Sequence, residues 1–473
     1  MRLSLFLASD DQPAVPEGVA EAHLALAATP SQTRGATHHD GDPTDPLAVQ
    51  RWAVVYPQAR PELLDALGPL IARRQEDQGA AVLRFPAHPD DDGTRLFQHL
   101  YDGGLSREES PRYVLVLGDL HEVSLDLQQR LAEVGALGRL AFDTVDGDRA
   151  YAEKALRWED ADPPSPARTL LYGAYDASDS ASVSGERDLL APIAELAARQ
   201  AMGPLPPQSF GRVPQGAADG MGALLTAAGA PDARLLLTVT HGLASASWSP
   251  QVRRARQGEL RIARGVSLAA EHVAGRAFLP GGLWVMFACF SAGTPSWSRF
   301  EPWLRELVDT GVYGQMADVV SALATDRPFI ATLPRAALAN PEGPLGVYGH
   351  IDLAWGWSFR DEAGGGASRA RRFGDLLQSA ARGDRVGLAY DPIQRAMRGA
   401  GHTLFSYAQV ERRRALTTDE RRERGHHWMT WNDLGAWILL GDPAARVPGP
   451  RLPPRTGPGP LRGPALAMRG AGS

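Results

Sequence analysis

Residues 235–242 (LLLTVTHG) and 283–293 (LWVMFACFSAG) are the two stretches that decide how this chain is expected to fold. Each opens with a run of apolar and β-branched residues, which predicts a buried strand. Each run ends in a side chain that can take part in chemistry, His241 after the first and Cys289 after the second. Parallel strands end together at one edge of a sheet, where ligands bind in open α/β sheets. We therefore expect both side chains at one site.

The rest of the chain alternates strand and helix patterns around these two stretches. Short apolar runs predict strands, and apolar residues at helical spacing predict helices. Strand–helix–strand order with short connections implies a parallel sheet. Strands are expected at 52–56, 80–85, 113–117, 169–172, 235–240, 283–288, 327–333 and 344–348, and helices at 62–78, 187–199, 369–382 and 403–422. An apolar run at 434–440 follows, before a Gly-Asp-Pro turn at 441–443.

The Pro-rich stretch 162–166 (DPPSP) divides this pattern into two parts. We predict an α/β subdomain at 50–160, without the His and Cys, and a second α/β subdomain at 165–447 that carries both. Residues 1–49 show little periodicity and are expected to form a loose N-terminal segment. The tail at 448–473 consists largely of Pro, Gly and Arg, and we expect it to be disordered.

A histidine and a cysteine at neighbouring strand ends are typical of nucleophilic catalysis. A thiol needs a base to form the thiolate, and the oxyanion formed on attack needs backbone N–H donors. His241 is the predicted base and Cys289 the predicted nucleophile. The N–H groups of Gly242 and Cys289 are the predicted oxyanion donors, since a glycine after the histidine permits close backbone approach.

Structural interpretations compete with this catalytic one. A lone cysteine at the end of an apolar strand is more often an inert core residue. The chain has twelve histidines, and His121, His272 and His350 are alternatives to His241. His121 and His350 also follow predicted strands, whereas His272 lies in a predicted helix. His241 is preferred because it ends a strand, precedes a glycine and comes before Cys289 in the chain.

The motifs resemble the caspase-like clan of cysteine peptidases, which includes caspases, gingipains, separase and the bacterial CHAT-domain peptidases. In caspases the histidine lies about 50 residues upstream of a Q-A-C-[RQG]-G signature. Phe287 replaces the glutamine here, which favours a gingipain-like or CHAT-like branch. Further stretches similar to that branch are 113–119 (YVLVLGD), 134–144 (VGALGRLAFDT), 347–359 (VYGHIDLAWGWSF) and 437–447 (WILLGDPAARV).

The resemblance implies a caspase-like α/β fold with two parallel-sheet subdomains and helices on both faces. It also implies a cysteine endopeptidase that hydrolyses protein or peptide substrates through an acyl-enzyme. A gingipain-like pocket holds Arg or Lys with an acidic residue, so Asp176, Asp179 and Asp352 are candidate substrate-binding residues, with Trp355 as a wall. Arginines at 251–257, interpreted as an exposed loop, are then candidate sites of self-cleavage.

Composition narrows the possible partners. The chain has 49 basic and 55 acidic residues, a net charge of −6, which argues against nucleic-acid binding. A single cysteine fits a reducing cytoplasm. The N-terminal apolar run is short for a secretory signal, and no run approaches the roughly 18 apolar residues of a membrane span. No zinc or nucleotide motif is present. We expect a cytoplasmic protein without a cofactor or metal.

Two other classes of function remain open at this stage. The chain is alternatively an inactive caspase-like scaffold that binds partners, or an unrelated doubly wound hydrolase or nucleotide-binding protein whose cysteine is part of the core. For the peptidase, the resemblance suggests a regulatory protein partner and a role in bacterial defence or cell death. Selective labelling of Cys289 by a thiol reagent would separate the enzyme from both alternatives.

Overall fold

The structure is a computed structural model. It describes residues 2–9, 12–26, 46–106, 108–161, 167–199, 210–212, 220–314, 316–323, 325, 327–361 and 367–449. The predicted linker at 162–166 and the predicted tail from residue 450 onward lie outside these residues.

Within the described part of the chain, one ten-stranded sheet forms the centre of the fold. All of its strand pairs are parallel except β18–β21. The predicted α/β class with a parallel sheet is therefore confirmed. The strands lie in the order β10 (Phe210–Arg212), β9 (Arg168–Gly173), β11 (Ala233–Val239), β15 (Leu283–Phe287), β18 (Gly346–His350), β21 (Trp437–Gly441), β8 (Ala136–Leu140), β7 (Tyr113–Leu117), β5 (Trp52–Pro57) and β6 (Leu83–Ala87).

Helices cover both faces of the half-sheet formed by β5 to β8. Val55, Val114 and Val116 point to one face and pack with α4 (Thr94–Tyr101) and α5 (Leu125–Leu131). Their neighbours along each strand belong to the opposite face, because side chains alternate along a strand. That face packs against α2 (Glu62–Ala66), α3 (Gly68–Gln78) and α6 (Val145–Glu159). Burial on both faces explains the continuous apolar runs in the sequence.

Asp442 ties the two halves of the sheet together at the turn after β21. Its carboxylate accepts hydrogen bonds from Trp52 Nε1 at 2.9 Å and from Arg74 Nε and Nη2 at 3.0 and 2.6 Å. Its backbone N–H donates to the hydroxyl of Tyr151 at 2.7 Å. Asp442 and Arg74 are fully buried, and Glu159 also binds the Arg74 guanidinium. Asp442, in the turn that follows β21, is thus the centre of a buried polar cluster.

Three segments differ from the sequence-based expectation. The strand expected at 327–333 is limited to β17 (Phe329–Ile330), and α14 (Thr332–Ala339) follows at once, because Pro334 is compatible with a first helical turn. The helix expected at 403–422 is two helices, α17 (Asp391–Glu411) and α18 (Thr418–Gly435). A capping box of Thr417 and Glu420 begins the second one. The loop expected at 251–257 is helix α10 (Pro250–Arg256), capped by Ser249.

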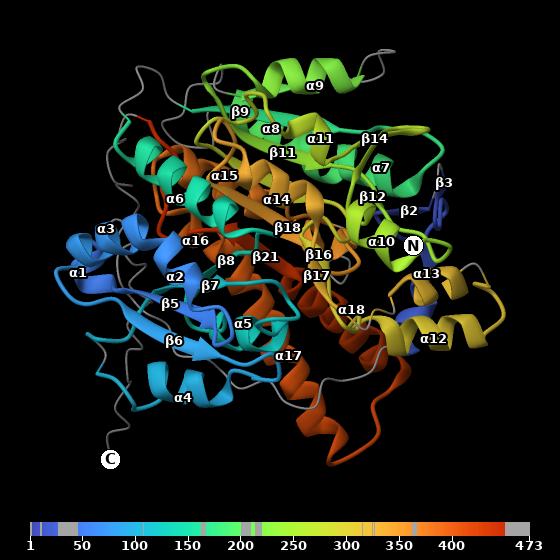
Figure 1. Cartoon of the computed structure of the whole chain (residues 1–473). Coiled ribbons are helices and arrows are strands. Elements are labelled where there is room, and N and C mark those ends of the chain that lie inside the picture. Colours follow the sequence, from blue (N-terminus) through green and yellow to red (C-terminus); the bar gives the residue numbers. More distant parts are fainter. Residues whose placement is uncertain are drawn as a thin grey trace, which may run out of the picture.

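The described part of the N-terminal segment is ordered against the sheet edge. Its strand β2 (Leu7–Ser9) lies in a five-stranded sheet with β3 (Gln12–Pro13), β12 (Gly242–Leu243), β13 (Leu260–Ala263) and β14 (Val266–Leu268). Leu3, Leu5, Phe6 and Ala8 are buried, in contrast to the loose segment we expected. Figure 1 shows the blue N-terminal strands beside β12, on the opposite side of the molecule from β5 and β6.

We predict that Asp442→Ala lowers the free energy of unfolding by about 3–5 kcal/mol, because it leaves the buried Arg74 charge without its main partner. Urea denaturation measures the change. The control is Asp419→Ala, whose side chain is 94% exposed and pairs with Arg422 at 3.9 Å, and which should cost less than about 1 kcal/mol. Equal effects of the two substitutions would contradict the role of the cluster.

Candidate functional site

The two chemically interesting strands are direct neighbours in register. β11 and β15 pair in parallel, with Val239 opposite Phe287. His241 and Cys289 each lie two residues beyond this last pair, so both reach the same edge of the sheet. A Cβ atom built on Gly242 would lie 1.8 Å from the carbonyl oxygen of Cys289. The chain after the histidine therefore touches the cysteine backbone, and only glycine fits there.

His241 is held by a carboxylate. Its Nε2 lies 2.6 Å from Oδ2 of Asp179, and both side chains are buried. Asp179 also caps α7 (Ser180–Ser184), accepting hydrogen bonds from the N–H groups of Ala181 and Ser182. Burial alone would raise the pKa of Asp179, but the hydrogen bond and charge of His241, together with the two N–H donors, lower it. An ionised carboxylate at Nε2 places the proton on that nitrogen.

The other ring nitrogen of His241 is open to a second partner. Nδ1 is buried and has no hydrogen-bond partner among the residues that the structure describes. With the proton on Nε2, neutral Nδ1 carries the lone pair and can accept a proton. Sequence reasoning placed Asp179 in a substrate pocket, and the structure places it behind the histidine instead.

Cys289 is fully buried. The Sγ atom accepts a hydrogen bond from the N–H of Ala354 at 3.1 Å and lies 3.8 Å from the Ala354 carbonyl oxygen. Burial raises the pKa of this thiol well above its ordinary value, and the nearby carboxylates of Asp352 and Asp433 add to the rise. In this conformation the Sγ atom is directed toward Ala354.

Two backbone donors converge on a single oxygen at the site. The N–H groups of Gly242 and Cys289 both donate to the carbonyl oxygen of Phe6, each at 3.1 Å. Donors 2.7–3.1 Å from the position of an oxyanion are the geometry of an oxyanion hole. The two groups that the sequence suggested as donors therefore point at one carbonyl, and that carbonyl belongs to the N-terminal segment.

A loop after β18 forms the second wall of the site, and Asp433 on α18 shapes it. The Asp433 carboxylate accepts hydrogen bonds from the N–H groups of Trp355 and Ser358, each at 2.7 Å. It also lies 3.1 Å from Nε2 of His350, which is fully buried. The hydrogen bonds of Asp433 to this loop hold the backbone around Ala354 against Cys289. The sequence contained no signal for Asp433, because the contact joins residues far apart in the chain.

The remaining predicted substrate-binding residues have other partners. The carboxylate of Asp176 is hydrogen-bonded to the N–H and hydroxyl of Ser178 in its own turn. Asp352 is buried and accepts hydrogen bonds from Ser298 and from the N–H of Arg299. Trp355 packs against Phe300 and Trp303, and its backbone faces the site.

The three alternative histidines lie in other environments. Nε2 of His121 lies 2.8 Å from Arg327, and His350 is bound to backbone carbonyls and to Asp433. His272 lies on α11 (Ala270–Val273), where its Nδ1 accepts the N–H of Ala269.

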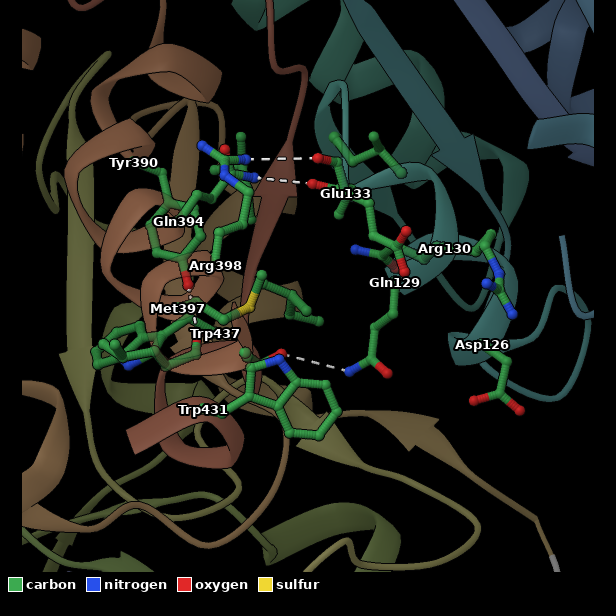
Figure 2. A pocket seen from close by; sticks show the side chains of 18 of the residues that line it. Asp126, Gln129, Arg130, Glu133, Tyr390, Gln394, Met397, Arg398, Trp431 and Trp437 are labelled. Carbon is green, nitrogen blue, oxygen red and sulfur yellow. Dashed lines mark hydrogen bonds between the residues drawn. The ribbon is translucent and has the colours of Figure 1, made fainter. Parts of the chain in front are cut away.

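A cavity of about 380 Å³ lies elsewhere, between the end of α5 and helices α17 and α18. Figure 2 shows Gln129 and Glu133 on one side and Gln394, Arg398 and Trp431 on the other. Hydrogen bonds cross it, including one from Gln394 Nε2 to the Ala132 carbonyl at 3.3 Å. Neither Cys289 nor His241 is among the described residues that line it. The chemistry at the strand ends therefore does not use this cavity.

Among the described residues, no cluster of three or more His, Cys, Asp and Glu side chains is arranged to hold a metal ion. None of the helices in the described ranges combines the length and apolar character needed to cross a membrane.

Comparison with solved structures shows a shared fold. A structure described as "Structure of Protease" has a TM-score of 0.51 and 12% sequence identity, over 86% of this chain and 80% of that one. The Arg-specific cysteine proteinase gingipain R gives 0.48 at 12% identity, over 86% and 80%. A complex of the Porphyromonas gingivalis RgpB pro- and mature domains gives 0.47 at 13%, over 84% and 79%. The sequence matches no family model and no curated protein. The first likeness shows that this chain has a protease-like fold.

We predict that Gly242→Ala lowers the free energy of unfolding by about 1–3 kcal/mol, because the new methyl group collides with the Cys289 backbone. Gly399→Ala is the matched control. Gly399 lies inside α17 with no heavy atom within 4 Å of the added Cβ, so alanine should stabilise the protein by about 0.5–1 kcal/mol. Urea denaturation of both variants tests whether the free energy of unfolding falls in Gly242→Ala and rises in Gly399→Ala. A Gly242→Ala variant as stable as the wild type would show that the strand ends are not in contact.

Proposed function

We propose that this protein is a cysteine endopeptidase that hydrolyses protein substrates through Cys289 and His241. The observation that carries the proposal is the convergence of the Gly242 and Cys289 N–H groups on one carbonyl oxygen, at 3.1 Å each. This oxyanion geometry occurs beside the only cysteine of the chain and a histidine held by a carboxylate. The protease-like fold is consistent with it.

The proposed reaction proceeds in two steps. The thiol of Cys289 transfers its proton to Nδ1 of His241, and Sγ attacks the scissile carbonyl carbon. The oxyanion is stabilised by the N–H groups of Gly242 and Cys289. His241 then gives the proton to the leaving amine, and the peptide bond breaks to leave a thioester on Sγ. A water molecule, deprotonated by His241, hydrolyses the thioester and restores the thiol.

Asp179 acts in this proposal as a positioning residue. Its carboxylate holds Nε2 of His241 at 2.6 Å, which fixes the ring and keeps the proton on Nε2. That tautomer leaves Nδ1 free to accept the proton from the thiol. The arrangement follows the general pattern in which a third group orients the base beside a nucleophile.

Cleavage after Arg or Lys is not part of the proposal. The acidic residues that were expected to bind a basic substrate side chain form hydrogen bonds with other residues. Asp179 is bound to His241, Asp352 to Ser298 and Arg299, and Asp176 to Ser178. The arginines expected as self-cleavage sites lie in helix α10, whereas a peptidase cleft takes an extended chain.

A second candidate function is a caspase-like scaffold without catalysis. It is favoured by the complete burial of Cys289 and by the contact of Sγ with Ala354. The sequence resemblance supports a regulatory partner, a CHAT-like or gingipain-like assignment and a role in bacterial defence. The cytoplasmic location rests on the composition of the chain. They remain proposals that accompany the peptidase.

We predict that Cys289→Ala abolishes hydrolysis of casein and of a mixed peptide library analysed by mass spectrometry. His241→Ala should lower the rate by about 10²–10⁴-fold, the usual contribution of a general base. His272→Ala is the control, since His272 lies on α11 and bonds within its own turn. Hydrolysis by Cys289→Ala equal to that of the wild type would exclude Cys289 as the nucleophile.

Asp179→Asn tests the positioning role apart from the helix cap, because asparagine caps helices as well as aspartate does. We predict a fall in kcat of at least about tenfold with little change in KM, since the orientation of His241 matters in the transition state and not in substrate binding. The thermal unfolding midpoint should stay close to that of the wild type. An unchanged kcat would contradict the role assigned to Asp179.

A further inference from the structure

The N-terminal segment crosses the candidate site as an extended strand. On one side, the N–H of Phe6 donates to the Ala354 carbonyl at 3.0 Å, and the N–H of Gly356 donates to Ser4 at 3.3 Å. Leu5 forms an antiparallel bridge with Trp355 between these bonds. Main-chain pairing of this kind is how extended peptides are recognised at a sheet edge.

On the other side of Phe6, the same segment pairs with the strand that follows His241. β2 lies parallel to β12, with Leu7 opposite Gly242 and Ala8 opposite Leu243. The N–H of Ala244 donates to the Ala8 carbonyl at 3.1 Å. The segment thus has main-chain bonds before and after Phe6, and the Phe6 carbonyl lies between them at the two convergent donors.

The Phe6 side chain fills an apolar pocket between the strand ends and is fully buried. Its ring packs edge-on against Phe287 with centroids 4.7 Å apart, and against Phe359 at 6.0 Å. Gly185 lies beside the ring, since a Cβ atom built on it would be 3.4 Å from the Phe6 ring, an ordinary van der Waals contact. Phe287, which replaces the glutamine of the caspase signature, forms one wall of this pocket.

We propose that residues 3–9 occupy the substrate cleft as a substrate would, and that the pocket around the Phe6 ring selects an aromatic or large aliphatic residue immediately before the scissile bond. This proposal rests on the peptidase function proposed above, and it identifies the substrate class. The peptide bond between Phe6 and Leu7 takes the place of the scissile bond. Phe6 therefore occupies the position of the substrate residue immediately before the scissile bond.

The chemistry of the pocket excludes a basic side chain. Its walls include the rings of Phe287, Phe359 and His241. The acidic residue of the site, Asp179, is bound to His241 and to two backbone N–H groups. A guanidinium in this pocket would lose its hydration without gaining a counter-ion, which costs several kcal/mol. An aromatic ring gains burial and edge-to-face contacts instead.

Because residues 3–9 occupy the cleft, they also compete with added substrate for it. A tethered segment has an effective concentration in the millimolar range for short flexible links, so added peptide must displace it. Only the fraction of molecules with the segment released can bind substrate. A substitution that weakens the binding of residues 3–9 in the cleft should therefore both expose Cys289 and increase the rate of hydrolysis.

The test uses the full-length chain with Phe6→Asp, which places a charge in the apolar pocket. Since Cys289 is the only cysteine, alkylation by iodoacetamide reports its exposure at a single site. We expect labelling at least about tenfold faster than in the wild type, the effect of ~1.4 kcal/mol of lost binding. Gln12→Asp is the control, since Gln12 is exposed on β3 and should label like the wild type.

The same variant is then assayed with peptides that differ only in the residue before the scissile bond. We expect kcat/KM for Phe or Leu to exceed that for Arg by at least about 100-fold. Phe6→Ala removes the ring without adding a charge and should shift labelling and activity in the same direction, which covers the case that Phe6→Asp does not fold.

The outcomes separate the two proposals. Labelling no faster in either Phe6 variant than in Gln12→Asp would overturn the occupancy of the cleft. A preference for Arg would overturn the apolar pocket while the peptidase proposal stands. Fast labelling without hydrolysis of any peptide would overturn the peptidase, and with it the specificity.

Discussion

The parallel pairing of β11 with β15 is the constraint on which the site depends. Each strand ends two residues before its candidate side chain, so the register that sets Val239 opposite Phe287 also brings His241 and Cys289 to one edge of the sheet. A slip of one residue would turn every side chain of a strand to the other face of the sheet. The strands are buried on both faces and cannot slip without burying the wrong set. The core therefore fixes the position of the catalytic candidates.

Two buried carboxylates, Asp179 and Asp433, shape the site at that sheet edge, and a third, Asp442, lies at the opposite edge of the sheet. Asp179 holds the histidine, Asp433 holds the loop that faces Cys289, and Asp442 joins the two halves of the sheet. Each accepts at least one backbone N–H, so each buried oxygen retains hydrogen bonds in place of water. An unpaired buried carboxylate would be costly. The same bonds that stabilise these charges determine where the neighbouring backbone lies.

The sequence was informative where the physical cause is local. Continuous apolar runs indicated the strands of a sheet covered on both faces, and the residues at their ends followed from the topology of a parallel sheet. It was less informative where the cause is a distant contact. Residues 176–180 (DASDS) are more typical of a solvated turn, and only the fold brings Asp179 under His241. The role of Asp433 depends on its contact with Trp355, which lies 78 residues away in the sequence. The position of Phe6 depends on its contact with Ala354, which lies 348 residues away.

The position of Phe6 links access to the cysteine with its ionisation. Burial is the largest cause of the raised pKa of Cys289, and the Phe6 carbonyl of the N-terminal segment accepts a hydrogen bond from the N–H of the same residue. In the proposal above, release of the segment lets water reach the thiol and removes the acceptor of the Gly242 and Cys289 N–H groups at the same moment. Burial disfavours the thiolate, so its removal makes ionisation easier. A single extended strand thus controls both the space that a substrate needs and the charge state that a nucleophile needs.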